Sequence, residues 1–206
     1  MAVAALEQAR IMQNDATATF YADNAAVYAT RERKLPVTRL EAFLVALPEG
    51  GTVLELGCGG GQDSAYMQSR GFDVTATDGS PELAREAEAL LDRSVEIIRF
   101  EELEKSAIFD GIWAEASLLH VPRSLMPDVF TRILRACKPG GVFHASFKSG
   151  DTEGHDEFGR YYNYLSADLL SGMLVNAGWS EVTITERDGS GYDGKPTRWL
   201  DVNAKR

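Results

Sequence analysis

Three glycines after a short apolar segment, Gly57, Gly59 and Gly61, and an aspartate about 20 residues further on, Asp78, have the types and spacing for ligand binding. Glycine has no Cβ, so such a loop turns tightly and brings backbone amides close to a ligand. A carboxylate at the end of the following strand can accept both hydroxyls of a ribose. The glycine spacing alone also fits a plain strand-to-helix turn. The position of Asp78 favours an adenosine-containing ligand.

These residues are positioned by alternating apolar runs and helical patterns, which predict an α/β fold with crossover connections around a parallel sheet. Two segments near the C-terminus, residues 181–186 and 198–204, are separated by a glycine-rich turn instead of a helix, which indicates an antiparallel pair of strands. Seven strands are predicted in all, over residues 52–56, 72–77, 95–99, 109–115, 141–147, 181–186 and 198–204.

Helices are predicted from periodicity and from their start and stop residues. Ser80 can cap a helix whose first turn contains Pro81 and Glu82, and Pro139 with two glycines ends another. The predicted helices cover residues 25–33, 38–47, 62–69, 81–91, 124–137 and 167–177. We expect a single domain over residues 1–206, with a helical cover over 1–50 and an α/β core over 51–206.

The composition indicates a globular chain of 206 residues with 44% hydrophobic residues and a formal net charge of −10. The negative charge disfavours nucleic acid as a partner. Cys58 and Cys137 lack the spacing of a zinc site or a disulfide framework, so no metal is expected. Polar residues interrupt the alanine-rich start (Glu7, Gln8, Arg10 and Asn14), and no run approaches the roughly 20 apolar residues of a membrane span. A cytoplasmic location is predicted.

A nicotinamide-dependent dehydrogenase is the natural competitor, because it also uses a glycine turn and a strand-end acid. Its fingerprint is Gly-x-Gly-x-x-Gly, whereas this loop has glycine at 57, 59 and 61. Asp63 at the helix start would repel a pyrophosphate. Asp63 fits either a place near a cationic ligand group or a helix cap.

Four segments, residues 54–61, 77–81, 109–113 and 134–141, resemble successive motifs of class I S-adenosylmethionine-dependent methyltransferases. The resemblance covers most of the chain, and the sequence is most similar in style to small bacterial, tellurite-resistance-like members. It implies a Rossmann-like seven-stranded sheet, mostly parallel with an antiparallel last strand, and helices on both faces. It also implies S-adenosylmethionine as the cofactor.

The resemblance places cofactor contacts by position. Glu55 would set the glycine loop, Asp78 would hold the ribose, and one of two glutamates would face the adenine edge. In the N-terminal segment, an aromatic face suits a sulfonium and an arginine suits a carboxylate, so Tyr21, Tyr28 and Arg31 are expected to close over the cofactor. The candidate cofactor-binding residues are Tyr28, Arg31, Glu55, Gly57, Cys58, Gly59, Asp78, Gly79, Ser80, Glu101, Glu102, Ala114 and Glu115.

Candidate acceptor-side residues follow the fourth and fifth strands. His120 has the intrinsic pKa of a general base but equally fits a structural role, and Arg160 and Tyr162 lie in a long polar loop over residues 148–165. Lys148 and Arg160 could pair with an anionic acceptor or balance nearby surface carboxylates. His144, inside a predicted strand, is interpreted as a structural histidine.

The favoured function is an enzyme that moves a methyl group to a small-molecule acceptor by in-line displacement, which mainly requires alignment and exclusion of water. The alternative is a non-catalytic S-adenosylmethionine-binding sensor or partner subunit, since binding motifs do not establish turnover. A protein or nucleic-acid acceptor is a third, disfavoured reading. A monomer or homodimer is expected.

Overall fold

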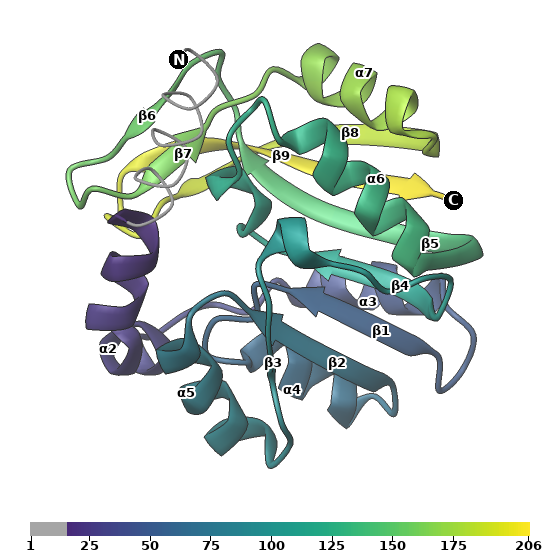
Figure 1. Cartoon of the computed structure of the whole chain (residues 1–206), viewed down its shortest axis with the longest axis horizontal. Helices are drawn as coiled ribbons and strands as arrows, with labels where there is room; N and C mark the ends of the chain where they lie inside the picture. The colour runs from purple at the N-terminus through teal and green to yellow at the C-terminus, as the bar shows by residue number, and fades with distance from the viewer. Residues whose placement is uncertain (1–15) are drawn as a thin grey trace.

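The computed structural model describes residues 16–206, and its centre is a seven-stranded sheet (Figure 1). Its strands are β1 (Thr52–Leu56), β2 (Asp73–Asp78), β3 (Glu96–Ile97), β4 (Phe109–Ala114), β5 (Cys137–Lys148), β8 (Ser180–Ser190) and β9 (Pro196–Lys205). Their spatial order is β3-β2-β1-β4-β5-β9-β8. The strands from β3 to β5 are parallel, whereas β9 runs antiparallel to both β5 and β8. The predicted α/β class, seven strands and antiparallel last strand are confirmed.

The order of the chain through the sheet reverses at β1, which has β2 on one side and β4 on the other. Crossovers therefore leave in opposite directions from neighbouring strands, and a crevice opens between their carboxyl ends. Leu56, Asp78 and Ala114 end β1, β2 and β4 at this one edge. The topology thus brings together three segments that are far apart in sequence.

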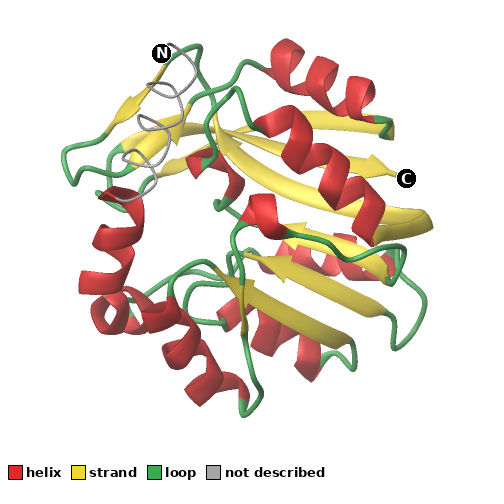
Figure 2. Ribbon diagram, in the orientation of Figure 1, coloured by secondary structure: helices red, strands yellow, loops and turns green. Residues whose placement is uncertain are grey.

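Helices cover both faces of the sheet (Figure 2). The side chains of β1 alternate, with Val53 facing one cluster of buried residues and Leu54 facing the other, as the two-residue period of a strand requires. On the Val53 side lie α3 (Val37–Val45), α4 (Gln62–Ser69) and α5 (Pro81–Leu91). On the Leu54 side lie α6 (Met126–Ala136) and α7 (Ala167–Ala177).

The N-terminal helices lie across the carboxyl edge of the sheet (Figure 1). Residues 16–23 are helical and α2 (Ala25–Thr30) follows. The side-chain amide of Gln62, in the first turn of α4, donates to the Ala29 carbonyl at 2.6 Å and ties α2 to the core. Residues 1–15 of the predicted cover, including the interrupted alanine-rich start, lie outside the described residues, and the predicted division into cover and core stays a prediction.

The prediction of a long loop over residues 148–165 is partly wrong. This segment contains a β-hairpin formed by β6 (Glu153–His155) and β7 (Tyr161–Asn163). Asp156 builds its turn, accepting hydrogen bonds from the amides of Phe158 and Arg160 at 3.0 and 2.9 Å. These three-residue strands are too short and polar to show an alternating pattern, so sequence periodicity did not reveal them.

Several boundaries differ from prediction. α2 stops at Thr30, three residues early, and β3 has only two residues because the short helix η1 (Phe100–Glu102) follows at once. α3 and α6 are shifted or shortened at their ends. β5 begins four residues earlier than expected, at Cys137, because the Pro139 turn is itself paired: the amide of Gly140 donates to the Arg206 carbonyl at 2.9 Å.

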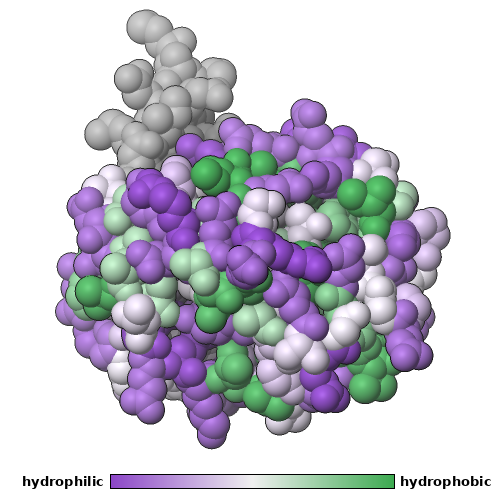
Figure 3. All heavy atoms as spheres, turned by 90° about the horizontal axis from the view of Figure 1, so that it is seen from below, coloured by the Kyte–Doolittle hydropathy of each residue, from purple (hydrophilic) through white to green (hydrophobic). Residues whose placement is uncertain are grey.

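Within residues 16–206, no helix combines the length and apolar character that crossing a membrane demands. The face seen in Figure 3 is mostly hydrophilic, with apolar residues scattered singly or in small groups. Such scattering is normal for a globular surface.

Candidate functional site

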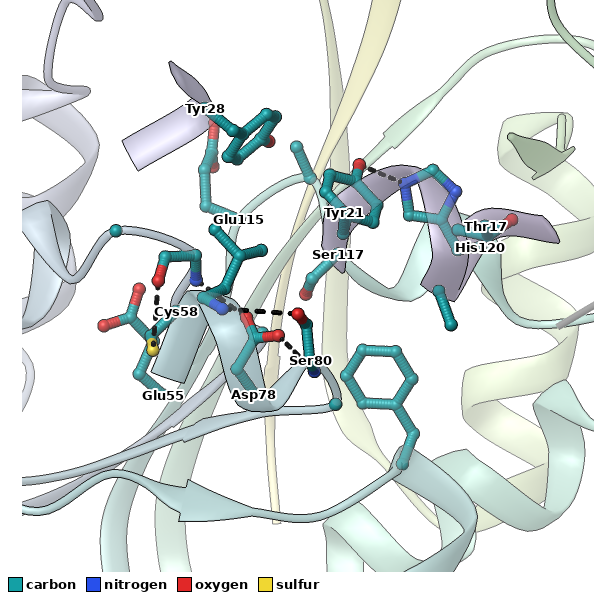
Figure 4. A pocket seen from close by; sticks show the side chains of 18 of the residues that line it. Thr17, Tyr21, Tyr28, Glu55, Cys58, Asp78, Ser80, Glu115, Ser117 and His120 are labelled. Carbon is teal, nitrogen blue, oxygen red and sulfur yellow. Dashed lines mark hydrogen bonds between the residues drawn. The ribbon is translucent and has the colours of Figure 1, made fainter. Parts of the chain in front are cut away.

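A cavity of about 210 Å³ opens at the carboxyl ends of β1, β2 and β4, under the N-terminal helices (Figure 4). Its walls come from the glycine loop, the end of β2, η1, the short helix η2 (Leu118–His120) and residues 16–33. Most of the predicted cofactor-binding residues meet there. They are Tyr28, Arg31, Glu55, Gly57, Cys58, Gly59, Asp78, Gly79, Ser80, Glu101 and Glu115.

The glycine loop needs its glycines. Gly57, Gly59 and Gly61 have φ of +74°, +57° and +81°, in the left-handed region that side chains disfavour. A Cβ at Gly57 would also lie 2.5 Å from the Cβ of Ser117. The amides of Gly57 and Cys58 both donate to the Thr77 carbonyl at 2.9 Å, so the loop is anchored to β2. The backbone of the loop is thereby fixed along the wall of the cavity.

Asp78 fastens the loop from the end of β2. One carboxylate oxygen accepts the Gly59 amide at 2.8 Å, and the other accepts the Ser80 amide at 2.8 Å. Burial raises the pKa of Asp78 to about 6, although the amides of Ser80, Gly59 and Gly79 oppose the shift. Each oxygen keeps a further lone pair, which can accept a hydroxyl from the cavity.

Glu55 lies at the floor of the cavity, on β1, and is 3% exposed. The hydroxyl of Ser64, on α4, donates to it. Burial raises the pKa of Glu55 well above its usual range, and the charge of Asp63 adds to the effect. A cationic ligand group beside Glu55 would favour its ionised form.

Asp63 also lines the cavity but does not cap α4; the helix begins after Gly61 without any side-chain cap, so the capping interpretation is wrong. Both carboxylate oxygens pair with Arg33, at 2.7 and 3.0 Å, and the indole N–H of Trp113 donates at 3.0 Å. Sequence reasoning missed Arg33, which sits two positions beyond the expected Arg31 and lines the same cavity. An arginine at the end of a helical pattern carried no distinguishing signal in the sequence.

Only one of the two candidate glutamates near η1 faces the cavity. Glu101 lines it, beside Phe100. Glu102 instead turns back and accepts the amide of Arg99 at 2.9 Å, which caps η1. The geometry therefore favours Glu101 for contact with the edge of a bound base.

Of the two candidate residues at the end of β4, likewise, only one faces the cavity. Ala114 is fully buried in the core and does not line the cavity, whereas Glu115 does. Burial alone would raise the pKa of Glu115, but His144, Arg39 and Arg187 lower it to about 2. Arg39 lies 2.7 Å away and Arg187 3.5 Å away. Glu115 is thus a fixed negative charge on the cavity wall.

His144 and Asp201 stand beside Glu115, and ligand atoms of these three side chains lie within 4.8 Å of one another. Carboxylate and imidazole groups are metal-ligand types. Here, however, the guanidinium of Arg187 binds both oxygens of Asp201, at 3.0 and 2.8 Å. Two arginines already balance the two carboxylates, so we interpret the group as an ion-pair network.

The N-terminal helices supply an aromatic wall. The ring of Tyr28 passes over the glycine loop, 3.5 Å from where a Cβ of Gly59 would lie. Arg31 stacks on that ring, 3.4 Å from its centroid. The hydroxyl of Tyr21 lies 2.9 Å from Nε2 of His120, and the two labelled side chains point at each other in Figure 4.

The hydrogen bonds of His120 define its tautomer. Nδ1 lies 2.6 Å from the Tyr161 carbonyl, which can only accept, so Nδ1 carries the proton. Nε2 is then the acceptor for the Tyr21 hydroxyl. Burial lowers the pKa of His120 to about 4, and the charges of Arg160 and Lys148 contribute. His120 is therefore neutral near pH 7.

Tyr162 and Arg160, the other candidate catalytic residues, do not line the cavity. The Tyr162 ring packs behind His120, with centroids 4.6 Å apart. Arg160 is 2% exposed and pairs with Asp156 at 2.6 Å. Both lie next to the imidazole and contact its surroundings, which makes them supports of His120 in this geometry.

The chain was compared with known proteins. A family model described as a methyltransferase domain matches residues 28–183. The ubiquinone biosynthesis O-methyltransferase of Xanthomonas campestris pv. campestris (strain B100) is 37% identical over 116 residues, or 51% of this chain and 46% of that protein. Its counterpart in Xanthomonas axonopodis pv. citri (strain 306) is 36% identical over 120 residues, or 52% and 48%.

Solved structures share the fold. A methyltransferase from Methanosarcina mazei has a TM-score of 0.73 at 16% identity, covering 85% of this chain and 99% of that one. The 1,6-didemethyltoxoflavin-N1-methyltransferase of Burkholderia thailandensis, solved with 1,6-didemethyltoxoflavin and S-adenosylhomocysteine, has a TM-score of 0.71 at 22% identity, covering 97% and 89%.

The fold and the cavity define a class I methyltransferase architecture, as the motifs predicted. The chain belongs to the methyltransferase domain family, because the family model covers well over half of it. The predicted class, a methyltransferase that uses S-adenosylmethionine, is confirmed. The matched segment spans about half the length of the ubiquinone biosynthesis relatives. The tellurite-resistance-like subgroup stays a prediction.

Proposed function

We propose that this chain transfers a methyl group from S-adenosylmethionine to a hydroxyl of a small molecule. The observation that carries the proposal is that one cavity holds the braced glycine loop and Asp78 at one end and the Tyr21–His120 pair at the other. An oxygen acceptor is favoured because the curated relatives are named O-methyltransferases. A bacterial, cytoplasmic monomer or homodimer is part of the same proposal.

The cofactor would supply a methyl group on a sulfonium, and the neutral thioether released when the methyl–sulfur bond breaks is a leaving group good enough to need no metal. Asp78 would accept the ribose hydroxyls, Glu101 would face the base, and Tyr28 would cover the sulfonium with its ring. Arg33 and Arg31 both line the cavity and can bind the cofactor's carboxylate. Glu55 and Glu115 would face its positively charged groups.

The Tyr21–His120 pair would remove the acceptor's proton. Tyr21 donates its own proton to Nε2 of His120, so its oxygen presents lone pairs to the cavity. As the acceptor oxygen bonds to the methyl carbon, its proton passes to Tyr21 and the tyrosine proton passes to His120. The products are then a methyl ether, a neutral thioether and an imidazolium. Tyr162 and Arg160 would hold the pair in place.

The first experiment is calorimetric titration with S-adenosylmethionine, S-adenosylhomocysteine and NAD, followed by methyl transfer to a panel of phenols, catechols and aliphatic alcohols. We expect the two sulfur compounds to bind and NAD not to bind. Tyr21→Phe and His120→Ala should each lower turnover by about 100-fold or more without weakening cofactor binding. His155→Ala, which changes an exposed histidine on the β6–β7 hairpin, is the control.

Two outcomes would overturn the proposal. Binding of NAD alone would reverse the cofactor assignment. Cofactor binding with no turnover on any acceptor would favour a sensor or partner subunit, the non-catalytic alternative. Full activity in Tyr21→Phe would remove the proton path but leave the reaction in place.

A further inference from the structure

Lys148 is a buried cation that the proposed reaction does not use. It is the last residue of β5, 8% exposed, at the same edge of the sheet as the cavity. Within residues 16–206 its ammonium forms no hydrogen bond and no ion pair; it packs 3.9 Å from the centroid of the Tyr162 ring.

The neighbouring carboxylates are already engaged. Asp156 binds Arg160 through two hydrogen bonds of 2.9 and 2.6 Å. Asp193 pairs with Lys195, at 3.6 Å. Burial lowers the pKa of Lys148, and the charge of Arg160 adds to that effect. Lys148 and Arg160 thus lie in a poorly solvated place where the nearby carboxylates, Asp156 and Asp193, already have partners, an arrangement that an additional anion would stabilise.

Lys148 lies next to the proposed base. The Tyr162 ring separates Lys148 from His120, contacting the ammonium on one side and the imidazole at a centroid distance of 4.6 Å. Lys148 ends β5 and His120 follows β4, and these strands are parallel neighbours. Lys148 does not line the cavity itself, so a ligand that places a hydroxyl at Tyr21 would have to reach it past the Tyr162 ring, along the same edge of the sheet.

We propose that Lys148 binds an anionic group, a carboxylate or a phosphate, on the methyl acceptor. The assignment rests on the proposed function and narrows its acceptor to hydroxylated organic anions. Arg160 stays paired with Asp156 and adds long-range attraction. Tyr162 sets the spacing between the anion and the reacting hydroxyl.

The assignment has a consequence for catalysis. The positive charge of Lys148 helps to keep the pKa of His120 low. An anion paired with Lys148 would cancel that charge and make the imidazole more basic. The base would then be strongest when a correctly charged acceptor is bound, which discriminates against neutral analogues of the same shape.

The test measures binding of 4-hydroxybenzoate, 4-hydroxyphenyl phosphate and the neutral 4-hydroxybenzamide to the protein saturated with S-adenosylhomocysteine. We expect at least one anionic probe to bind about tenfold or more tightly than the amide. Lys148→Met, which keeps the length of the side chain, should abolish this preference, and Lys148→Arg should retain part of it. The tighter of the two anionic probes identifies carboxylate or phosphate as the natural group.

Lys195→Met is the matched control, because it removes an exposed cation from the nearby β8–β9 turn. It should leave the preference unchanged. Equal affinity for the three probes, no binding of either anion, or a preference that survives Lys148→Met would each overturn the assignment. Binding of S-adenosylhomocysteine is measured in the same samples. If it does not bind, the proposed function is contradicted. If it binds but the protein shows no preference for the anionic probes, only the role of Lys148 is contradicted.

Discussion

Asp78 illustrates how one residue can serve a ligand at a cost to the folded state. It is 8% exposed, and its two backbone hydrogen bonds only partly compensate for burial. Its pKa is raised from 3.8 to about 6, so the folded chain holds this proton more tightly than the unfolded chain does. The contribution of Asp78 to stability is therefore fully present below pH 3.8 and is lost as the pH rises through 6. At neutral pH it costs on the order of 3 kcal/mol.

This shift predicts a pH dependence of cofactor binding. An ionised Asp78 accepts two ribose hydroxyls better than a protonated one, so the affinity for S-adenosylhomocysteine should fall as the pH is lowered from 7.5 through 6 to 5. Calorimetry at these pH values gives the profile. Asp78→Ala should bind at least about tenfold more weakly at pH 7.5 and show a flatter profile.

Asp73→Asn provides the comparison, because Asp73 begins the same strand and its exposed side chain pairs with Arg93. It should behave as the wild type does. An unchanged affinity in Asp78→Ala, or a profile that is equally steep in both variants, would rule out Asp78 as the ribose ligand.

At the scale of elements, helix starts show how local chemistry decides a boundary. α7 begins after Ser166, whose hydroxyl accepts the Leu169 amide at 3.3 Å, and α5 begins after Ser80 in the same way. A side-chain acceptor at this position satisfies an amide that the helix itself leaves unpaired. Ser166 lies away from the cavity, so its effect on stability can be measured without disturbing the site.

Ser166→Ala should therefore lower the free energy of unfolding by about 1 kcal/mol, as measured by urea denaturation. Ser171→Ala, inside the same helix, should change it by a few tenths or raise it slightly, since alanine is the better helix former. Equal effects of the two substitutions would show that the Ser166 cap contributes nothing specific.

The same local chemistry explains which elements could be predicted from the sequence. The bounds of α4, α5, α7 and β1 agree with prediction because caps, glycines and periodicity lie within each segment. The β6–β7 hairpin was missed because distant contacts hold it. Arg123 donates to the carbonyls of Thr152 and Tyr164, at 3.2 and 2.8 Å, across about 30 and 40 residues of chain. No local pattern encodes such contacts.

For the site, residues fixed by the sheet were predictable and those depending on side-chain direction were not. Asp78 and the glycine loop follow from strand ends. Glu101 and Glu102 are adjacent and chemically identical, so only the turn of η1 distinguishes them. Arg33 is held at the cavity by Asp63, which also accepts the indole N–H of Trp113, so three separate segments converge there.

At the scale of the whole molecule, the Glu115 network connects elements that lie far apart in sequence. It joins Arg39 on α3, Arg187 on β8 and Asp201 on β9 to the end of β4. The pKa of Glu115 is lowered from 4.5 to about 2, so its carboxylate contributes stability above pH 4.5 and loses that contribution as the pH falls toward 2.

Glu115→Gln should consequently lower the free energy of unfolding at pH 7 by about 2–3 kcal/mol, because it removes one of the two carboxylates that balance the partly buried Arg39 and Arg187. Urea denaturation at pH 7 and at pH 4 should show the difference from the wild type shrinking at the lower pH. Glu181→Gln, which removes an exposed pair with Lys205, should cost less than about 0.5 kcal/mol. A difference that is independent of pH would mean that the charge of Glu115 is not what stabilises the fold.

The arrangement of the sheet has a consequence for how this family diversifies. Most of the proposed cofactor-binding residues lie on or directly after β1, β2 and β4, whereas Lys148, the β6–β7 hairpin and the β8–β9 turn belong to the other half of the molecule. Insertions and substitutions in those connections can reshape the acceptor wall while the first half keeps its geometry. Natural variation, or a directed library restricted to residues 148–165 and 191–195, could therefore change which acceptor is bound while the proposed cofactor-binding residues stay the same.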